Sequence, residues 1–309
     1  MSRQPKNWAT HSIRPDTNVH AAAGFALDPV PQYGLPMANH LSSDQVTHYQ
    51  RDGFLFPLRG TAAEEALQYR TSLEAARASH PELMQGVEAQ KLHLVTTWMA
   101  DIVRTPTILD AVESLIGPDL LCWSSTLFVK PADGKSFVSW HQDGNYWGLS
   151  NPEIVSAWLA LSASTVESGC MQMVPGSHEW DTTEHNETFD ADNLLSRGQV
   201  MKREIDSSDA VDLVLAPGEI SLHHVNVAHA SAPNNSTDDR IGIAIRYVSP
   251  NVKQRLSEKD SATLVRGEDR VGNFEHEERP AHDFEPAAMS RLAHIVARRK
   301  STVYQDTPQ

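Results

Sequence analysis

The chain has 309 residues, of which 40% are apolar and 21% charged, a composition that is ordinary for a globular protein. Its formal net charge of -14 argues against nucleic acid or an anionic membrane as the main partner, because either would favour a basic patch. No apolar run approaches the length of a membrane span, the N-terminus resembles no secretory signal and both cysteines lie in apolar stretches, so a cytoplasmic location is expected.

The first third of the sequence predicts an irregular arm followed by helices. Residues 1–40 are rich in Pro, Asn, Gly and Ala without clear periodicity and predict the arm. The run Leu41-Ser42-Ser43-Asp44-Gln45 is rich in N-cap residues, so a helix is expected to start there and to end at Gly53. A short strand is then predicted at 54–57, and helices are predicted at 61–78, 93–103 and 108–116.

From Leu120 onward the sequence predicts strands. Apolar, aromatic and β-branched runs separated by Gly, Pro, Asn and Asp occur at 120–130, 137–142, 154–162, 170–174, 211–215, 219–223 and 241–248. No crossover helices lie between these runs, so an antiparallel arrangement is favoured over a parallel α/β sheet. We therefore expect a mainly β fold with flanking helices, namely a cupin-like jelly roll or double-stranded β-helix.

We expect a single jelly-roll domain over residues 41–309. Its parts are a helical segment at 41–119, a β core at 120–250 and a C-terminal lid loop with a helix at 251–309. The polar residues 181–208 predict an excursion over one end of the barrel. In the C-terminal part, the expected features are a charged, loop-like stretch at 251–281, a candidate lid at 266–270 and a closing helix at 285–300.

The motif Trp140-His141-Gln142-Asp143 could supply two metal ligands. Residues two apart on a strand point to the same side, so His141 and Asp143 can chelate one ion from one strand end. Two imidazoles and one carboxylate can hold one face of a ferrous ion and leave its other positions open for oxygen chemistry. On chemistry alone, the candidates for the third ligand are His223, His224 and His229.

A second segment carries an ordered set of residues: Gly218-Glu219, His224, His229-Ala230-Ser231, Asn234, Ser236 and Arg240. This order is similar to the C-terminal signature of the phytanoyl-CoA dioxygenase family, whose members are Fe(II)- and 2-oxoglutarate-dependent oxygenases. The resemblance covers most of residues 41–250. Its other segments are Leu41 to Phe56, the His141 motif, Ala157 to Leu161, Glu167 to Cys170 and Pro175 to His178.

The resemblance implies a facial triad of His141, Asp143 and His229 around Fe(II), with 2-oxoglutarate and O2 as cosubstrates. It matches His224 to a family histidine that is not a ligand, for which a buried hydrogen-bonding role is the better interpretation. The segment Pro175-Gly176-Ser177-His178 is interpreted as structural, because Pro and Gly favour a tight turn whose Ser and His satisfy backbone groups.

The distal carboxylate of 2-oxoglutarate needs a planar, permanently charged fork, which arginine supplies. The resemblance implies Arg240 for this role and Ser231 as a hydroxyl donor to the same carboxylate. The alternatives are a solvated strand-end arginine and a plain turn serine. Trp158 matches a family tryptophan that lies against the cosubstrate, with a simple core position as the alternative. Thr126 and Lys91 occupy positions where the family sometimes contacts the cosubstrate.

The substrate pocket is less well defined. Asn145, Tyr146 and Trp147 follow the metal pair and should line the pocket mouth. The Tyr-Trp pair could cage a quaternary amine or simply cover an apolar chain. Arg246 is an even number of residues from Arg240 on one strand, so both point to one face, where Arg246 reaches either substrate or structure. We expect a small metabolite as substrate, and the acidic balance favours an amine-bearing one unless it serves only solubility.

The reaction that the resemblance implies is hydroxylation of an unactivated C–H bond, with decarboxylation of 2-oxoglutarate to succinate. Related halogenases replace the carboxylate ligand with Ala or Gly, so Asp143 favours hydroxylation over chlorination, while desaturation or cyclisation start from the same hydrogen abstraction. Two alternatives stay open: a non-catalytic jelly roll that binds a metal or small ligand, and an oxygenase of CoA- or carrier-tethered acyl groups. Arg240 favours an enzyme. The sequence does not define the oligomeric state.

Overall fold

The computed structural model describes residues 40–181, 184–188, 190–195 and 198–301. The chain divides after Met37, and all described residues belong to the unit Ala38–Gln309. The irregular arm predicted for residues 1–40 therefore lies, apart from His40, outside the described residues. The assignment of one domain to residues 41–309 stays a prediction.

The helices begin and end at local sequence signals. α1 (Ser43–Asp52) starts with a capping box, in which Ser42 and Gln45 each accept a hydrogen bond from the other's backbone amide. Gly53 ends it in the left-handed region, at φ 83°. The other helices are α2 (Ala63–Ser79), α3 (Thr97–Ile102), α4 (Pro106–Ile116), α5 (Gly144–Trp147) and α6 (Pro286–Lys300). Within the described ranges, no helix combines the length and apolarity needed to cross a membrane.

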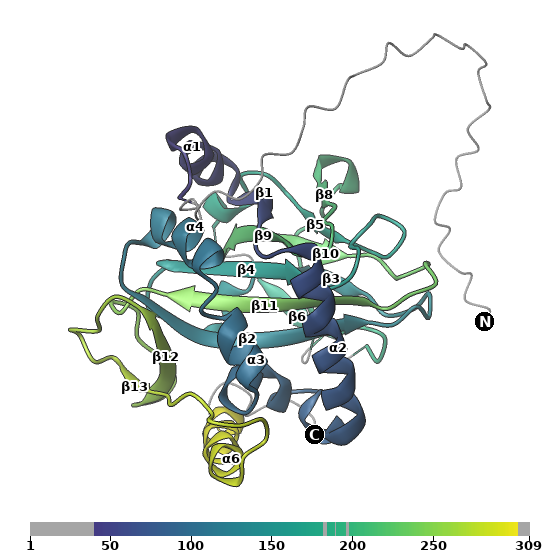
Figure 1. Ribbon diagram of the computed structural model, residues 1–309. Coiled ribbons are helices and arrows are strands. Elements are labelled where there is room, and N and C mark those ends of the chain that lie inside the picture. Colours follow the sequence, from purple (N-terminus) through teal and green to yellow (C-terminus); the bar gives the residue numbers. More distant parts are fainter. Residues whose placement is uncertain (1–39, 182–183, 189, 196–197, 302–309) are drawn as a thin grey trace, which may run out of the picture. The chain divides into compact units, whose positions relative to one another are not determined.

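The strands form two main sheets and a small hairpin. Seven strands form the larger sheet, in the order β1-β9-β4-β11-β2-β12-β13, and four form the smaller, in the order β3-β10-β5-β8. Figure 1 shows β1, β9, β4, β11 and β2 side by side. The strands are β1 (Phe54–Arg59), β2 (Leu120–Lys130), β3 (Val138–His141), β4 (Ile154–Ala160), β5 (Met171–Met173), β6 (His185–Glu187), β7 (Gln199–Met201), β8 (Val211–Leu213), β9 (Glu219–His224), β10 (His229–Ser231), β11 (Arg240–Val248), β12 (Asp260–Arg266) and β13 (Phe274–His276). The mainly β jelly-roll fold is thus confirmed.

The two faces of β11 have different surroundings, because its side chains point alternately to opposite sides of the sheet. Ile241, Ile243 and Ile245 belong to the core formed with the helices, and burying each contributes roughly 1.5–3 kcal/mol. The even-numbered residues face the smaller sheet, where Ala244 packs in a second core with Met171 and Met173 of β5. Because alternate residues of a strand point to opposite faces, the even-numbered arginines of β11 point between the sheets.

The C-terminal part differs from its prediction. The stretch 251–281 was expected to be loop-like, but it contains β12 and β13, and β12 pairs with β2. The first half of β12 is polar although it is buried, and a polar composition does not predict a buried strand. In the candidate lid at 266–270, Arg266 is tied by ion pairs to Asp110 and Glu113 of α4. The helix expected at 93–103 begins as a single 3-10 turn before α3.

Candidate metal and cosubstrate site

The two histidines of the predicted triad face each other across a strand pair. β10 runs antiparallel to β3, and its register places His229 directly opposite His141. The centroids of the two imidazole rings lie 4.0 Å apart. Strand pairing therefore brings together two potential ligands that are far apart in the sequence. β10 has only three residues and was not predicted as a strand.

Each imidazole is oriented by a backbone carbonyl. Nδ1 of His141 donates to the Ser139 carbonyl at 2.9 Å, and Nδ1 of His229 donates to the Val227 carbonyl at 3.0 Å. With Nδ1 engaged in this way, the Nε2 atom of each imidazole can coordinate a metal ion. Nε2 of His141 lies 3.5 Å from Oδ1 of Asp143. One ligand atom from each of these three residues lies within 4.8 Å of the others.

The electrostatics of the triad suit a divalent cation. All three side chains are buried. Burial alone would raise the pKa of Asp143, but the hydrogen bond from His141 and neighbouring cationic groups hold that pKa well below its usual range. Burial lowers the pKa of His229 to about 4. At neutral pH the site therefore offers an ionised carboxylate and a neutral His229, a donor set that fits ferrous iron.

The other two candidate histidines lie outside this ligand group. His223 also lines the cavity beside the triad, and its ring centroid lies 5.2 Å from that of His229. Nδ1 of His224 accepts a hydrogen bond from the Asn226 amide at 3.1 Å, and this side chain does not line the cavity. The geometry thus supports His229 as the third ligand and a hydrogen-bonding role for His224.

The Pro175 to His178 turn is structural, as predicted. The Ser177 hydroxyl donates to the Val174 carbonyl at 2.6 Å and accepts from the Ala228 amide at 2.8 Å. Nε2 of His178 lies 3.0 Å from the Gln50 carbonyl. The turn thus fixes the loop that precedes β10 and connects it to α1.

The triad opens onto a cavity of about 490 Å³ between the two sheets. The predicted excursion at 181–208 contributes Leu194, Leu195 and Gln199 to its wall. The predicted site residues that line the cavity are His141, Asp143, His229, Arg240, Ser231, Trp158, Thr126, Tyr146, Trp147 and Arg246. Lys91 and Asn145, also predicted, do not line it.

Arg240 reaches the cavity from β11 and is only 2% exposed. Its Nη1 donates to the Gly169 carbonyl at 2.8 Å, and its guanidinium lies 5.3 Å from the centroid of the Trp158 ring. Gly242 leaves space for this indole, because a Cβ there would lie 2.0 Å from Trp158 Cζ2. Burial lowers the pKa of Arg240 to about 10, so it stays charged at neutral pH. Its Nε has no hydrogen-bond partner and no carboxylate pairs with it among the described residues.

Lys130 is a further candidate that the sequence analysis missed. The register of β2 on β11 places it directly opposite Arg240. Its ammonium donates to the Ser231 hydroxyl at 2.6 Å, to the Gly169 carbonyl at 3.2 Å and to the Ala232 carbonyl. Burial, and then the charge of Arg240, lower the pKa of Lys130 to about 6. The lysine is therefore mostly neutral at neutral pH, and an anion bound here would favour its protonated form.

Ser231 and Thr126 occupy opposite sheets around this region. Ser231 is the last residue of β10, two beyond His229, and its hydroxyl accepts from Lys130. Thr126 lies opposite Ala244 on the β2–β11 pair and lines the cavity. Contacts of both hydroxyls with a cosubstrate stay predictions.

The other end of the cavity is aromatic. Trp147 of α5 lies with its ring centroid 5.4 Å from that of Trp123. The guanidinium of Arg246 lies 5.3 Å from the centroid of Trp147 and 5.7 Å from that of Phe128. On an extended strand Arg246 is about 20 Å from Arg240, so the two arginines mark opposite ends of the cavity.

Asn145 and Tyr146 lie beside the predicted excursion. The Asn145 amide bonds with the ring of His185 on β6, and Tyr146 meets that ring edge-on with centroids 5.4 Å apart. Asn145 lines a neighbouring cavity of about 590 Å³, whereas Tyr146 lines both cavities. Asn145 therefore does not line the main cavity as predicted, whereas Tyr146 and Trp147 do.

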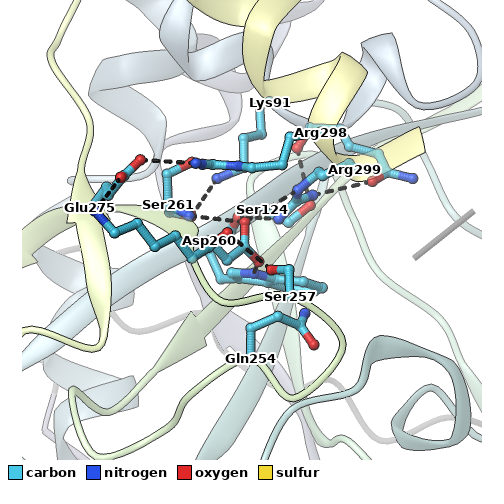
Figure 2. A network of polar contacts seen from close by, with 12 residues as sticks. Lys91, Ser124, Gln254, Ser257, Asp260, Ser261, Glu275, Arg298 and Arg299 are labelled. Atoms are coloured by element: carbon cyan, nitrogen blue, oxygen red, sulfur yellow. Dashed lines mark hydrogen bonds and ion pairs between the residues drawn. The ribbon is translucent and has the colours of Figure 1, made fainter. Parts of the chain in front are cut away.

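Lys91 is directed away from the proposed cosubstrate region. Its ammonium donates to the Ser261 carbonyl at 2.8 Å and to the Glu277 carboxylate. Figure 2 shows Lys91 in a polar network with Ser261, Asp260 and Arg299. This geometry argues against the predicted cosubstrate contact, because the charge of Lys91 is already matched by a buried carboxylate.

Comparison with known sequences identifies relatives of this chain. The phytanoyl-CoA dioxygenase family model matches residues 49–242. A protein of Stutzerimonas stutzeri named "Probable alpha-ketoglutarate-dependent hypophosphite dioxygenase" is 28% identical over 159 residues, which are 51% of this chain and 55% of that protein. The ectoine dioxygenase of Streptomyces avermitilis is 26% identical, over 53% of this chain and 62% of its own. The chain thus spans less than two thirds of these two relatives.

Solved structures extend the likeness beyond these segments. The structure titled "non-heme monooxygenase; ThoJ apo" is 36% identical, with a TM-score of 0.76, and the match covers 85% of this chain and 98% of that one. The structure of CytC3 with Fe(II) and alpha-ketoglutarate is 24% identical with a TM-score of 0.61, a likeness that shows the fold alone.

Proposed function

This chain belongs to the phytanoyl-CoA dioxygenase family of Fe(II)- and 2-oxoglutarate-dependent oxygenases, and we propose that it hydroxylates an unactivated C–H bond of a small-molecule metabolite. His141, Asp143 and His229 hold the iron in this proposal, and Arg240 binds the distal carboxylate of 2-oxoglutarate. One observation carries the proposal. The buried triad shares its cavity with a buried arginine that no carboxylate of the described residues neutralises.

When bound, Fe(II) would allow O2 to act as the oxidant, with two electrons supplied by 2-oxoglutarate, which would leave as succinate and CO2, and two by the C–H bond of the substrate. The chain's own residues bind and orient. The carbonyls that hold both Nδ1 atoms fix the imidazoles, while Arg240 and Ser231 fix the distal end of the keto-diacid. Trp158 covers that end, and the cavity wall limits the access of water. No side chain is required as a general base.

The names of the relatives support a small substrate. Hypophosphite and ectoine are both small molecules, and a cavity of about 490 Å³ has the size of an ordinary small-ligand site. The identity of the substrate and the carbon that is oxidised do not follow from these names.

In the first test, Fe(II) and 2-oxoglutarate are added to the chain without oxygen, and the weak visible charge-transfer band of the complex is measured. We expect the band in the native chain and its loss in His141→Ala and in Arg240→Ala. His178→Ala is the matched control and should keep the band, because His178 bonds to the Gln50 carbonyl of α1 and packs against His224, which does not line the cavity. A native chain without the band, or an undiminished band in His141→Ala, would refute the site.

The second test is turnover. His229→Ala should release no succinate, because it removes the third ligand. The control variant His224→Ala should retain succinate release, although with some loss of stability. Full activity in His229→Ala would show that the ligand set is wrong.

Two alternatives are favoured less. A non-catalytic binder of a metal or small ligand has no need for a buried arginine placed beside the triad. A CoA- or carrier-tethered acyl substrate would call for a basic docking patch, which the sequence does not indicate. A cytoplasmic location stays a prediction, consistent with two buried free cysteines, Cys122 and Cys170. An amine-bearing substrate also stays a prediction.

A further inference from the structure

Two side chains of the main cavity bury a polar atom that has no hydrogen-bond partner among the described residues. The atoms are Nδ1 of His223 and Oε1 of Gln199, and both residues line the cavity. His223 is 3% exposed and Gln199 is 8% exposed. Folded proteins rarely bury such an atom unpaired, because it loses its hydrogen bonds to water and gains none in return. A ligand in the cavity would supply the partners that the fold does not.

His223 reaches the cavity from the larger sheet. In β9, Ile220 and Leu222 belong to the core formed with the helices, so the odd-numbered His223 points between the sheets. Its ring centroid lies 5.2 Å from that of His229. The imidazole of His223 therefore lies beside the triad without belonging to the group of three ligands.

Gln199 is connected to the other histidine of the triad. It is the first residue of β7, and its backbone carbonyl accepts a hydrogen bond from the Ser139 hydroxyl. The carbonyl of the same serine accepts from Nδ1 of His141 at 2.9 Å. Gln199 and His223 thus approach the triad through different strands, one beside His141 and the other beside His229.

The bonding capacity of these two side chains indicates which chemical group they would bind. Oε1 of Gln199 accepts a hydrogen bond, and a neutral imidazole offers one donor and one acceptor. An uncharged amide has an N–H that can donate to Gln199 and a carbonyl that can accept from His223. An ester has no donor for Oε1 of Gln199, and an ammonium group brings a charge that neither side chain matches.

We propose that the substrate carries an uncharged amide, which hydrogen-bonds to Gln199 and His223 and so places a neighbouring C–H bond beside the triad. This inference rests on the proposed function, since it assumes that iron occupies the triad and that 2-oxoglutarate extends toward Arg240. His223 and Gln199 then determine specificity, because they select the substrate and hold neither the metal nor the cosubstrate.

The first test needs no substrate. If both polar atoms are unpaired in the ligand-free chain, replacing either side chain removes no hydrogen bond. His223→Leu and Gln199→Leu should therefore leave the urea midpoint of the ligand-free chain unchanged or raise it. Ser177→Ala is the control and should lower the midpoint, because the Ser177 hydroxyl makes two buried hydrogen bonds. A midpoint that falls in both leucine variants as far as in Ser177→Ala would overturn the proposal.

The second test is calorimetric binding to the anaerobic holoenzyme that contains Fe(II) and 2-oxoglutarate. The probes have three carbon skeletons, propyl, cyclohexyl and benzyl, and each is supplied as an N-methylamide, a methyl ester and an N-methylamine. We expect the amides to bind about tenfold more tightly than the matched esters, because only an amide pairs both buried atoms. Equal binding of amides and esters, tighter binding of the amines, or no binding of any amide would overturn the proposal.

Variants assign the preference for amides to the two side chains. Gln199→Leu and His223→Leu should each remove most of the advantage of amides over esters. Gln172→Leu and His224→Leu are the matched controls and should retain it, because they make the same changes outside the cavity lining. An advantage that survives in both cavity variants would contradict the proposal.

The charge-transfer band separates this inference from the function on which it rests. A native chain without the band would refute the oxygenase proposal itself. A native band with no preference for amides would refute only the substrate class. If His223→Leu or Gln199→Leu abolishes the band, the replaced residue serves the iron or the cosubstrate, and the substrate proposal fails.

Discussion

Two buried charged regions lie beside β2, and they differ in how their charges are matched. The first, which we call the C-terminal network, contains Lys91, Asp260 and Arg299, which are labelled in Figure 2, together with Glu277. Lys91 pairs with Glu277, and Arg299 lies 3.8 Å from Asp260. Each cation therefore has a carboxylate, and the two ion pairs connect Lys91 to the residue that follows β13 and α6 to β12.

The second region contains Lys130 and Arg240, and no carboxylate of the described residues pairs with either. Their acceptors are carbonyls and one hydroxyl. We interpret this difference as one of role: a buried charge with a partner of opposite sign stabilises the fold, whereas one without such a partner is the better candidate for ligand binding. This distinction locates the cosubstrate end of the cavity more firmly than the identity of any single residue.

The largest effect is expected from breaking the C-terminal network. Glu277→Gln keeps the side-chain size but leaves the buried Lys91 without its counter-ion. We expect the free energy of unfolding to fall by about 3–5 kcal/mol, the usual cost of breaking a buried ion pair. Urea denaturation of the chain measures this change.

The double variant Lys91→Met with Glu277→Gln is the control for this prediction. It removes both charges and should recover a large part of the lost stability, as a double-mutant cycle would show. If the double variant is as unstable as Glu277→Gln alone, the pairing of Lys91 with Glu277 does not explain the network. Neither change should alter the affinity of the iron-loaded chain for 2-oxoglutarate in variants that fold.

Arg240→Met should have little effect on stability and a large effect on the affinity for 2-oxoglutarate, the reverse of Glu277→Gln. It removes a buried cation that has no carboxylate partner, so the unfolding free energy should change by less than about 1 kcal/mol. The affinity for 2-oxoglutarate should fall about 100-fold, because a buried, charge-assisted contact is lost. Titration of the visible band gives the affinity and urea denaturation the stability. A large loss of stability with little loss of affinity would mean that Arg240 stabilises the fold and does not bind 2-oxoglutarate.

The elements that the sequence predicts correctly carry local signals. Ser42, Gly53 and Pro106 mark helix ends through their own backbone preferences. The apolar alternation of β11 marks both a strand and its two faces. No local signal marks β12, because its first residues are polar and are buried only through partners far along the chain, such as the Asp260 bond to the Trp123 indole at 2.6 Å.

The lack of a local signal also explains why the sequence analysis selected Lys91 as a cosubstrate contact and missed Lys130. The resemblance suggested Lys91, but it cannot show that the partner of Lys91 is Glu277, 186 residues later. Lys130 ends an apolar strand before Pro131, which is typical of a solvated strand end. Its even spacing from Thr126 and Phe128 was the available signal, because it places Lys130 on the inner face of the sheet.

A pH titration sharpens the comparison at Lys130. The pKa of this group is lowered to about 6, far below its unfolded value, so the unfolded chain binds more protons between these two pH values. Stability without ligand should therefore rise with pH across that window. Bound 2-oxoglutarate favours the protonated ammonium, so affinity should fall as the pH rises above about 6, by at most about tenfold per unit.

Lys130→Met is the control for the pH titration, since it leaves the metal ligands in place. Its affinity for 2-oxoglutarate should be lower at pH 6 and should vary less between pH 6 and 8. An unchanged pH profile in this variant would assign the effect to other groups and exclude Lys130 from the cosubstrate end.

The smallest effect is expected from Asp260→Asn, a change at the point where the C-terminal network meets the aromatic end of the cavity. Asp260 accepts from the indole of Trp123, which lines the aromatic end of the cavity, and lies close to Arg299. Asparagine retains one acceptor but not the charge, so we expect the unfolding free energy to fall by about 1–2 kcal/mol. Tryptophan fluorescence should shift as Trp123 gains freedom, while the charge-transfer band stays unchanged. Because the family model ends at residue 242, a shift of this kind would mean that the C-terminal segment beyond it shapes the aromatic end of the cavity. A weakened band would mean instead that the two charged regions are coupled.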